Sequence, residues 1–370
     1  TEANSNMVEV SITDLTGLQR ARRILQVLDL ATVYKQIDEH ETLNLEGCYI
    51  KDFSLSLYRQ DRGLAETDLV ELRDLNAQGA YFDIEKGVDF VHAKFTGQKT
   101  SFDQCLFGDG PLSFYHAKFE ADSTTFEACQ FGSGKINFHY IDVKSKSISF
   151  NNTSFGSGDV EFISASFSAQ KVTFKETHFG EGSVDFHYST FGDGSLSFDK
   201  ARFGGGEVSF KRVDFGHGKV DFKRVDFGDG FIDFSEADFR SGKAVFRSSQ
   251  FGNGDVNFSD VASESDFIFD NVEFGQGKLL FFNTTARKLS FQLCQFNSYV
   301  DLRVDRVGKI DLSHTIVRDI VDLMPTDRCP VKIQSLELKG MRNLGNLYID
   351  WRENGVLKLI QSQPDSTLKQ

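Results

Sequence analysis

The sequence predicts an all-β fold, a four-sided parallel β-helix with about 24 residues in each coil and a helical N-terminal cap. Three observations lead to this prediction. Phenylalanine dominates the aromatic residues, with 38 Phe against 9 Tyr and 1 Trp. From Phe90 to Phe258 a ladder of phenylalanines, with Val143 in one place, advances by alternating steps of five and seven residues. Within that region the text F-G-x-G returns at a constant interval, starting at positions 107, 131, 155, 179, 203, 227 and 251.

Each repeat unit has the pattern of a very short strand. In Val220-Asp221-Phe222 the outer two residues face one side and the middle residue faces the other, because side chains alternate along a strand. Such a strand is too short for a hairpin, but it can stack on a copy of itself one coil later. We therefore expect the ladder to fill the core. Representative members are Phe107, Phe131, Phe155, Phe179, Phe186, Phe203, Phe210, Phe227 and Phe251.

The two kinds of long loop set the length of one coil. Every second long loop is F-G-x-G, beginning at Phe107 and ending with the loop after Phe251, whereas the loops between them vary. Because the two kinds form different columns, one coil must contain one loop of each kind and so about 24 residues. Residues 90–258 then make seven coils. We expect the loop glycines to supply backbone angles that other residues disfavour.

The repeats resemble those of the pentapeptide-repeat family. Val220-Asp221-Phe222-Lys223-Arg224 and Ala237-Asp238-Phe239-Arg240-Ser241 fit its motif, and the likeness extends over residues 72–323. The resemblance implies a right-handed, four-sided β-helix. Two extra residues on alternate sides depart from the motif and predict corners that project.

Three segments are expected along the chain. Residues 1–42 form an N-terminal cap, with an amphipathic helix over 14–30. Residues 43–323 form the β-helix, and residues 324–370 form a C-terminal cap or linker with a short helix near 355–362. The last segment resembles the one that closes the β-helix in some bacterial pentapeptide-repeat proteins, where a membrane segment can follow.

Net charge, the absence of a long apolar run and the cysteine content limit the classes of function that we expect. A net charge of −13 argues against direct nucleic-acid binding and permits a basic partner. The chain has no apolar run long enough for a membrane span, and its five sparse cysteines are typical of buried thiols in a reducing compartment. We expect a cytoplasmic protein, unless a flanking segment supplies an anchor.

The sequence shows no acid–base pair, nucleophile triad or metal-ligand spacing, so we expect no enzyme and no cofactor. One alternative is a calcium-binding β-roll, because Asp109, Glu181 and Asp229 recur in the F-G-x-G column. Another comes from the family resemblance: an acidic DNA mimic that binds a type II topoisomerase such as gyrase, or another DNA-binding protein.

The favoured hypothesis is a non-catalytic scaffold that binds a protein partner, whose identity the sequence does not reveal. Aromatic and basic side chains expected to point outward could form the contact surface. The candidates are Tyr115, His139, His187, Tyr188, Lys211 and Arg212.

Overall fold

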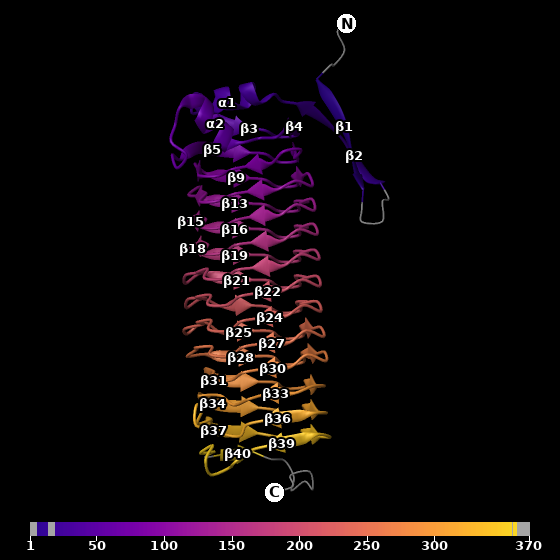
Figure 1. Ribbon diagram of the computed structural model, residues 1–370, viewed down its shortest axis with the longest axis vertical. Coiled ribbons are helices and arrows are strands. Elements are labelled where there is room, and N and C mark those ends of the chain that lie inside the picture. Colours follow the sequence, from indigo (N-terminus) through magenta and orange to yellow (C-terminus); the bar gives the residue numbers. More distant parts are fainter. Residues whose placement is uncertain (1–5, 14–18, 357, 361–370) are drawn as a thin grey trace.

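The computed structural model describes residues 6–13, 19–356 and 358–360. They form an all-β parallel solenoid of about 14 coils with about 24 residues in each coil, which confirms the predicted fold class. Figure 1 shows the coils stacked into one rod, with the helices near the N-terminal end and β40 (Lys358–Ile360) near the other.

Each regular coil has four sides. The first side is a 12-stranded sheet in which residues one coil apart pair in parallel, as Ile136 pairs with Val160. An 18-stranded sheet covers the second and third sides. The fourth side consists of two five-stranded sheets joined by isolated bridges, such as Gln130 with Ser154.

The strands of the first side are β7 (Val88–Asp89), β11 (Leu112–Ser113), β14 (Ile136–Asn137), β17 (Val160–Glu161), β20 (Val184–Asp185), β22 (Val208–Ser209), β24 (Ile232–Asp233), β27 (Val256–Asn257), β30 (Leu279–Leu280), β33 (Val300–Asp301), β36 (Ile320–Asp322) and β39 (Asn346–Tyr348). The 18-stranded sheet holds β3 (Thr42–Asn44), β5 (Val70–Asn76), β8 (Ala93–Thr96), β9 (Lys99–Ser101), β12 (Lys118–Phe119), β13 (Ser123–Thr125), β15 (Asp142–Val143), β16 (Ser147–Ser149), β18 (Ser166–Phe167), β19 (Lys171–Thr173), β21 (Ser195–Ser197), β23 (Val220–Asp221), β25 (Ala244–Val245), β28 (Asp266–Ile268), β31 (Thr285–Ser290), β34 (Arg306–Asp311), β37 (Lys332–Glu337) and β40. The remaining strands are β1 (Met7–Thr13), β2 (Gln19–Val27), β4 (Cys48–Lys51), β6 (Tyr81–Asp83), β10 (Leu106–Phe107), β26 (Gln250–Phe251), β29 (Glu273–Phe274), β32 (Gln295–Phe296), β35 (Ile316–Val317) and β38 (Arg342–Asn343).

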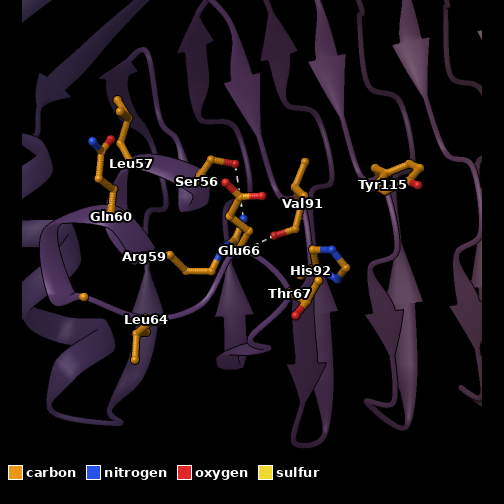
Figure 2. A pocket seen from close by; sticks show the side chains of 11 residues that line it. Ser56, Leu57, Arg59, Gln60, Leu64, Glu66, Thr67, Val91, His92 and Tyr115 are labelled. Carbon is orange, nitrogen blue, oxygen red and sulfur yellow. Dashed lines mark hydrogen bonds between the residues drawn. The ribbon is translucent and has the colours of Figure 1, made fainter.

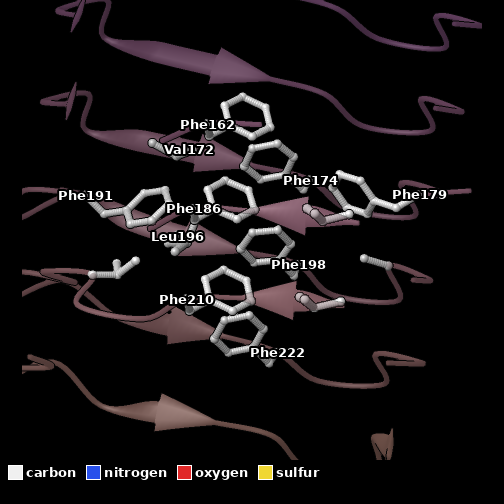
Figure 3. Packing of buried hydrophobic residues seen from close by; sticks show 14 of the residues in the cluster. Phe162, Val172, Phe174, Phe179, Phe186, Phe191, Leu196, Phe198, Phe210 and Phe222 are labelled. Carbon is white, nitrogen blue, oxygen red and sulfur yellow. The ribbon is translucent and has the colours of Figure 1, made fainter. Parts of the chain in front are cut away.

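The phenylalanine ladder lies inside the solenoid (Figure 3). Phe186 stacks on Phe210 of the next coil at 5.0 Å between ring centroids and meets Phe198 edge to face at 5.8 Å. Stacked and edge-to-face rings both suit the aromatic quadrupole. The nine core phenylalanines named from the sequence are all buried.

Small inward residues complete the core beside the rings. Thr177 donates a hydrogen bond of 2.7 Å to the Phe150 carbonyl, and Cys129 occupies an equivalent place and donates to the Phe102 carbonyl. The polar groups of this column thus satisfy backbone acceptors inside an apolar core. All five cysteines are free and buried, and burial raises the pKa of the Cys129 thiol well above its usual value.

Two-residue corners join the first side to the second and the third to the fourth. Their second residue has a positive φ in coil after coil, for example 55° at Ala128 and 56° at Tyr140. The preceding strand residue often stabilises the corner, as when Asp221 accepts a hydrogen bond of 3.1 Å from the amide of Lys223. The left-handed conformation here is imposed on ordinary residues by the repeat.

The F-G-x-G corners need glycine for a different reason from the one expected. The first glycines of most of these loops, including Gly132 and Gly156, do not have a positive φ. Instead, a β-carbon on Gly156 would overlap with the carbonyl oxygen of Gly132 in the preceding coil. Close stacking of backbone on backbone, rather than backbone angle, therefore explains most of this column.

The N-terminal cap differs from the prediction. Residues 19–27 of the expected helix form the strand β2, which pairs with β1 in an antiparallel hairpin; residues 14–18 lie outside the described residues. The helices are α1 (Leu30–Asp38) and α2 (Leu55–Arg62). Tyr34 of α1 packs on Phe53 of the first coil at 6.1 Å, so a helix does close the hydrophobic core.

The C-terminal end also differs from the prediction. Turns occupy residues 351–355, and β40 follows where a short helix was expected; residues 357, 361 and 362 lie outside the described part of the chain. Its strand β40 pairs in parallel with β37 and so adds to the solenoid. Within the described residues, no helix combines the length and the apolar character needed to cross a membrane.

Candidate functional site

The six surface residues predicted from the sequence lie on one corner of the rod, between the first and second sides. We call it the aromatic corner and define it as residues 91–92, 115–116, 139–140, 163–164, 187–188 and 211–212. Its second residues all have φ between 52° and 61°. The structure thus brings together Tyr115, His139, His187, Tyr188, Lys211 and Arg212, whose role in contacts it does not test.

Hydrogen bonds between coils hold the aromatic corner in line. The amide of His92 donates to the carbonyl of Tyr115 at 2.9 Å, and the amide of His116 donates to that of His139 at 3.0 Å. The same bond recurs from Tyr140 to Ile163 at 3.1 Å. Side chains of successive corners are therefore about one strand spacing, or about 4.8 Å, apart.

Aromatic rings stack along this corner. His92 lies parallel to His116 at 5.2 Å between centroids, and His116 lies parallel to Tyr140 at 4.9 Å. Tyr115 meets both His116 and Tyr140 edge-on. Burial lowers the pKa of His92, and the nearby His116 and Arg59 lower it further, which favours the neutral form of this ring.

The ring column is interrupted at Ser164. Beyond it, Tyr188 lies parallel to the ring of His187 at 4.1 Å and is 50% exposed. The Arg212 guanidinium sits 5.5 Å from the Tyr188 ring centroid and donates a hydrogen bond of 2.6 Å to its hydroxyl group. Glu236 of the next coil accepts from Arg212 at 2.7 Å.

His139 and His187 differ in their partners. His139 contacts Glu161 through Nε2 at 2.7 Å, and Glu161 also pairs with Lys135 at 2.8 Å. In His187, Nε2 is shielded from solvent and has no hydrogen-bond partner among the described residues.

The opposite two-residue corner has the same backbone but a different chemistry. Its second residues include Asn152, Glu176, Lys200, Arg224 and Ser248. We call it the polar corner and define it by residues 103–104, 127–128, 151–152, 175–176, 199–200, 223–224, 247–248 and 270–271. Lys200 pairs with Glu176 at 2.6 Å, and Arg224 pairs with Asp199 at 2.6 Å. Acidic groups that are neutralised by ion pairs in this way give little support to the hypothesis of an acidic DNA mimic, which stays a prediction.

A groove of about 890 Å³ lies where α2 meets the aromatic corner (Figure 2). Leu57 and Leu64 line it from α2 and the loop that follows, and His92 and Tyr115 line it from the corner. Arg59 is 2% exposed and donates from Nη1 to the Val91 carbonyl at 2.7 Å. In later coils the amide of the second corner residue donates to the equivalent carbonyl of the next coil. The α2 insertion removes the corner that would supply this amide to Val91, and the Arg59 side chain donates the hydrogen bond instead.

The acidic residues of the F-G-x-G column have backbone partners. Asp109 accepts a hydrogen bond of 2.9 Å from the amide of Ser133, and Asp229 accepts one of 2.8 Å from the amide of Asn253. Glu181 accepts from Gly205 in the same way, at 2.9 Å. These side chains join successive loops, and the described residues contain no group of three or more His, Cys, Asp or Glu placed to hold a metal ion.

Four members of the site were not among the candidates named from the sequence. His92, His116 and Tyr140 stand in one column with Tyr188 and follow the same period as the F-G-x-G loops, so the period itself could have found them. The fourth missed residue, Arg59, gives no such signal because it lies in an insertion that interrupts the repeat.

Comparison with known proteins adds a structural likeness. No family model and no curated protein matches the chain. Among solved structures, one match is HetL, a pentapeptide repeat protein involved in heterocyst differentiation regulation from the cyanobacterium Nostoc. The match covers 92% of this chain and 100% of that chain, at 10% sequence identity and a TM-score of 0.22. At that score the likeness carries no argument about function.

Proposed function

We propose that the protein is a non-catalytic β-solenoid scaffold that binds a protein partner along its aromatic corner. The observation that carries the proposal is the contrast between two corners of identical backbone design. From residue 92 to residue 188 one bears His and Tyr rings, several of them stacked, whereas the other bears ion-paired and amide side chains. The two corners have the same backbone conformation, so the backbone does not explain why their side chains differ.

The exposure of the rings supports a binding role. Tyr140 is 46% exposed and Tyr188 is 50% exposed, although both belong to a type of residue that gains from burial. Tyrosine is enriched at protein interfaces because its ring buries a large area and its hydroxyl group still finds a polar partner. A partner that covers this corner would bury both rings.

The test replaces the rings and compares a matched variant of the polar corner. In Tyr140→Ser/Tyr188→Ser the rings are lost, and in Asn152→Ser/Asn271→Ser two exposed polar-corner positions change to the same residue. Proteins bound from an extract of the native cells are identified by mass spectrometry. The partner is then purified, and its affinity for each variant is measured by calorimetry.

We expect the partner to bind the wild-type chain and the Asn double variant alike, and the Tyr double variant at least about ten-fold more weakly. Equal binding to both double variants would refute the aromatic corner as the interface. Circular dichroism and thermal melting establish that both variants keep the solenoid.

A further inference from the structure

We infer that the aromatic corner takes an arginine side chain of the partner, stacked on the open face of Tyr140 above Ser164. This inference rests on the proposed function and names the chemistry of the partner segment. Four features of the described residues support it: a gap in the ring column, a guanidinium already stacked on the same column, carbonyl groups that accept from arginine, and the local charge.

The gap is one coil wide. Among the described residues, the ring contacts of Tyr140 come from Tyr115, His116 and His139, all on its N-terminal side or its own corner. The next corner consists of Ile163 and Ser164 and contributes no ring; Ser164, which follows Tyr140 in the column, has a small side chain, and the next ring in the column is Tyr188, two coils or about 9.6 Å from Tyr140. A planar group needs about 3.5–4 Å on its stacked side, which this space provides.

The chain itself shows what fits such a ring. Arg212 follows Tyr188 in the column, and its guanidinium lies 5.5 Å from the Tyr188 ring centroid. Ser164 follows Tyr140 in the same way, but its side chain is too short to cover the ring as Arg212 covers that of Tyr188. A guanidinium over Tyr140 would repeat, at an earlier step of the column, the contact that Arg212 makes with Tyr188.

The corner backbone also supplies hydrogen-bond acceptors. On the polar corner, Nη1 of Arg23 donates to the carbonyl of Gln104 at 2.8 Å and, in the preceding coil, to that of Gly79 at 3.4 Å. Gln104 and Gly79 are the second residues of their corners and have a positive φ. Tyr140 and Ser164 occupy the same position in the aromatic corner. In the described chain no hydrogen bond reaches the carbonyl of Tyr140 or that of Ser164. They are therefore available to the guanidinium of a partner.

Charge favours a cation at this place. Asp185 and Glu161 occupy the outward middle of the strands that lead into the corners at 187–188 and 163–164. Glu161 is paired, but no ion pair to Asp185 is found among the described residues. The whole chain carries −13. Arginine suits the site better than lysine because its planar group can stack and donate in several directions at once.

Two labelled peptides of equal charge serve as probes, acetyl-(Gly-Arg)₃-amide and acetyl-(Gly-Lys)₃-amide. Their binding to the full chain is followed by fluorescence anisotropy at neutral pH and physiological ionic strength. We expect the arginine peptide to bind about three- to five-fold more tightly than the lysine peptide, the gain typical of an exposed cation–π contact. Equal affinities would overturn the inference, since they would indicate attraction by net charge alone.

A matched pair of serine variants locates the site. Ser164 and Ser248 are both second residues of a two-residue corner, with φ of 55° and 58°, on the aromatic and the polar corner respectively. Ser164→Tyr places a ring in the gap and should abolish the preference for arginine, whereas Ser248→Tyr should leave it unchanged. Tyrosine already occupies this backbone conformation at Tyr140, so folding is expected in both. Preference lost equally in both variants, or in neither, contradicts the proposed site.

Failure of the inference can be told apart from failure of the proposed function. If Tyr140→Ser/Tyr188→Ser loses the purified partner while Ser164→Tyr still binds it, the aromatic corner is the interface but the arginine site is wrong. If Ser164→Tyr and the Tyr double variant both lose the partner, and the arginine preference disappears with them, both proposals stand. Tyr140→Phe, which keeps the ring, should retain the arginine preference; its loss there would overturn the stacking geometry.

Discussion

Nη1 of Arg59 donates a hydrogen bond of 2.7 Å to the carbonyl oxygen of Val91, at the point where the aromatic corner begins. In the next coil the equivalent carbonyl, that of Tyr115, accepts from the backbone amide of His92. The α2 insertion displaces the corner that would have supplied such an amide to Val91. A buried guanidinium from α2 donates this hydrogen bond instead. One side chain thus satisfies the first carbonyl of the corner and holds α2 against the solenoid.

Replacing Arg59 should therefore destabilise the N-terminal coils. In Arg59→Met the long apolar stem is kept but the Val91 carbonyl loses its charged donor, and we expect the free energy of unfolding to fall by about 1.5–3 kcal/mol. Urea unfolding followed by circular dichroism measures the change. Gln60→Met, on the exposed side of the same helix, is the control and should stay within about 0.5 kcal/mol of the wild type. Similar effects of the two substitutions would contradict the capping role of Arg59.

The loop F-G-G-G at 203–206 offers a second test, of why the long corners contain glycine. A β-carbon on Gly204 would overlap with the carbonyl oxygen of Gly180, whereas a β-carbon on Gly205 would meet only the flexible end of Glu181, at 3.2 Å. Neither residue has a positive φ. We expect Gly204→Ala to lower stability by about 1–3 kcal/mol through overpacking and Gly205→Ala to change it by less than about 0.5 kcal/mol. Thermal melting of the two neighbouring variants would show the difference, and equal melting temperatures would disprove the stacking explanation.

The repeat length was predictable because these stacked glycines leave a trace in the sequence. Only glycine fits where Gly156 lies against Gly132, so F-G-x-G returns in every coil from Phe107 to Phe251 in this column, and its spacing reveals the length of the coil. The two-residue corners leave no such trace. Their positive φ falls on residues as different as Ala128, Tyr140 and Arg224, because pairing with the neighbouring coils imposes the conformation.

The same distinction explains the error at the N-terminus. Leu18, Ala21, Leu25 and Leu28 have the spacing of a helix face, which predicted a helix over 14–30. In the structure Leu25 is buried and Ile24 beside it is exposed, the alternation of a strand. The deciding partner is β1, through pairs such as Val8 with Leu25, and this pairing is not visible in the periodicity of residues 14–30 alone.

Backbone strain at the two-residue corners gives a third prediction. Ala128 is exposed and has a φ of 55°, a conformation that costs a residue with a β-carbon about 1–2 kcal/mol. Ala128→Gly removes that cost but adds flexibility to the unfolded chain, so we expect a net gain of about 0.5–1 kcal/mol. Ala31→Gly, the same change in α1, should instead lower stability by about 0.5–1 kcal/mol. Denaturant unfolding of both variants checks the opposite signs, and a loss at both positions would mean that the corners are not strained.

Asp311 carries the fourth prediction, on the pH dependence of stability. Burial alone would raise its pKa, but hydrogen bonds from Gln292 at 2.8 Å and from the Ser313 amide at 3.1 Å, with Lys288 at 3.2 Å, hold the pKa at about 2. In the unfolded chain an aspartate has a pKa of about 3.9. The folded state therefore binds this proton more weakly, and the stability from Asp311 is fully present above about pH 4 and disappears as the pH falls toward 2.

Removing the carboxylate should flatten that dependence. Between pH 5 and pH 2.5 the wild-type chain is expected to lose about 1–2 kcal/mol through Asp311, in addition to losses from other carboxylates. Asp311→Asn should be less stable at pH 5, because Lys288 then faces no charge, and should lose correspondingly less on acidification. The exposed Asp327, for which no ion pair is found among the described residues, serves as a control: Asp327→Asn should keep the wild-type slope. Urea midpoints measured across this range decide between the two, and an unchanged slope in Asp311→Asn would show that the carboxylate is not held in its charged form by the fold.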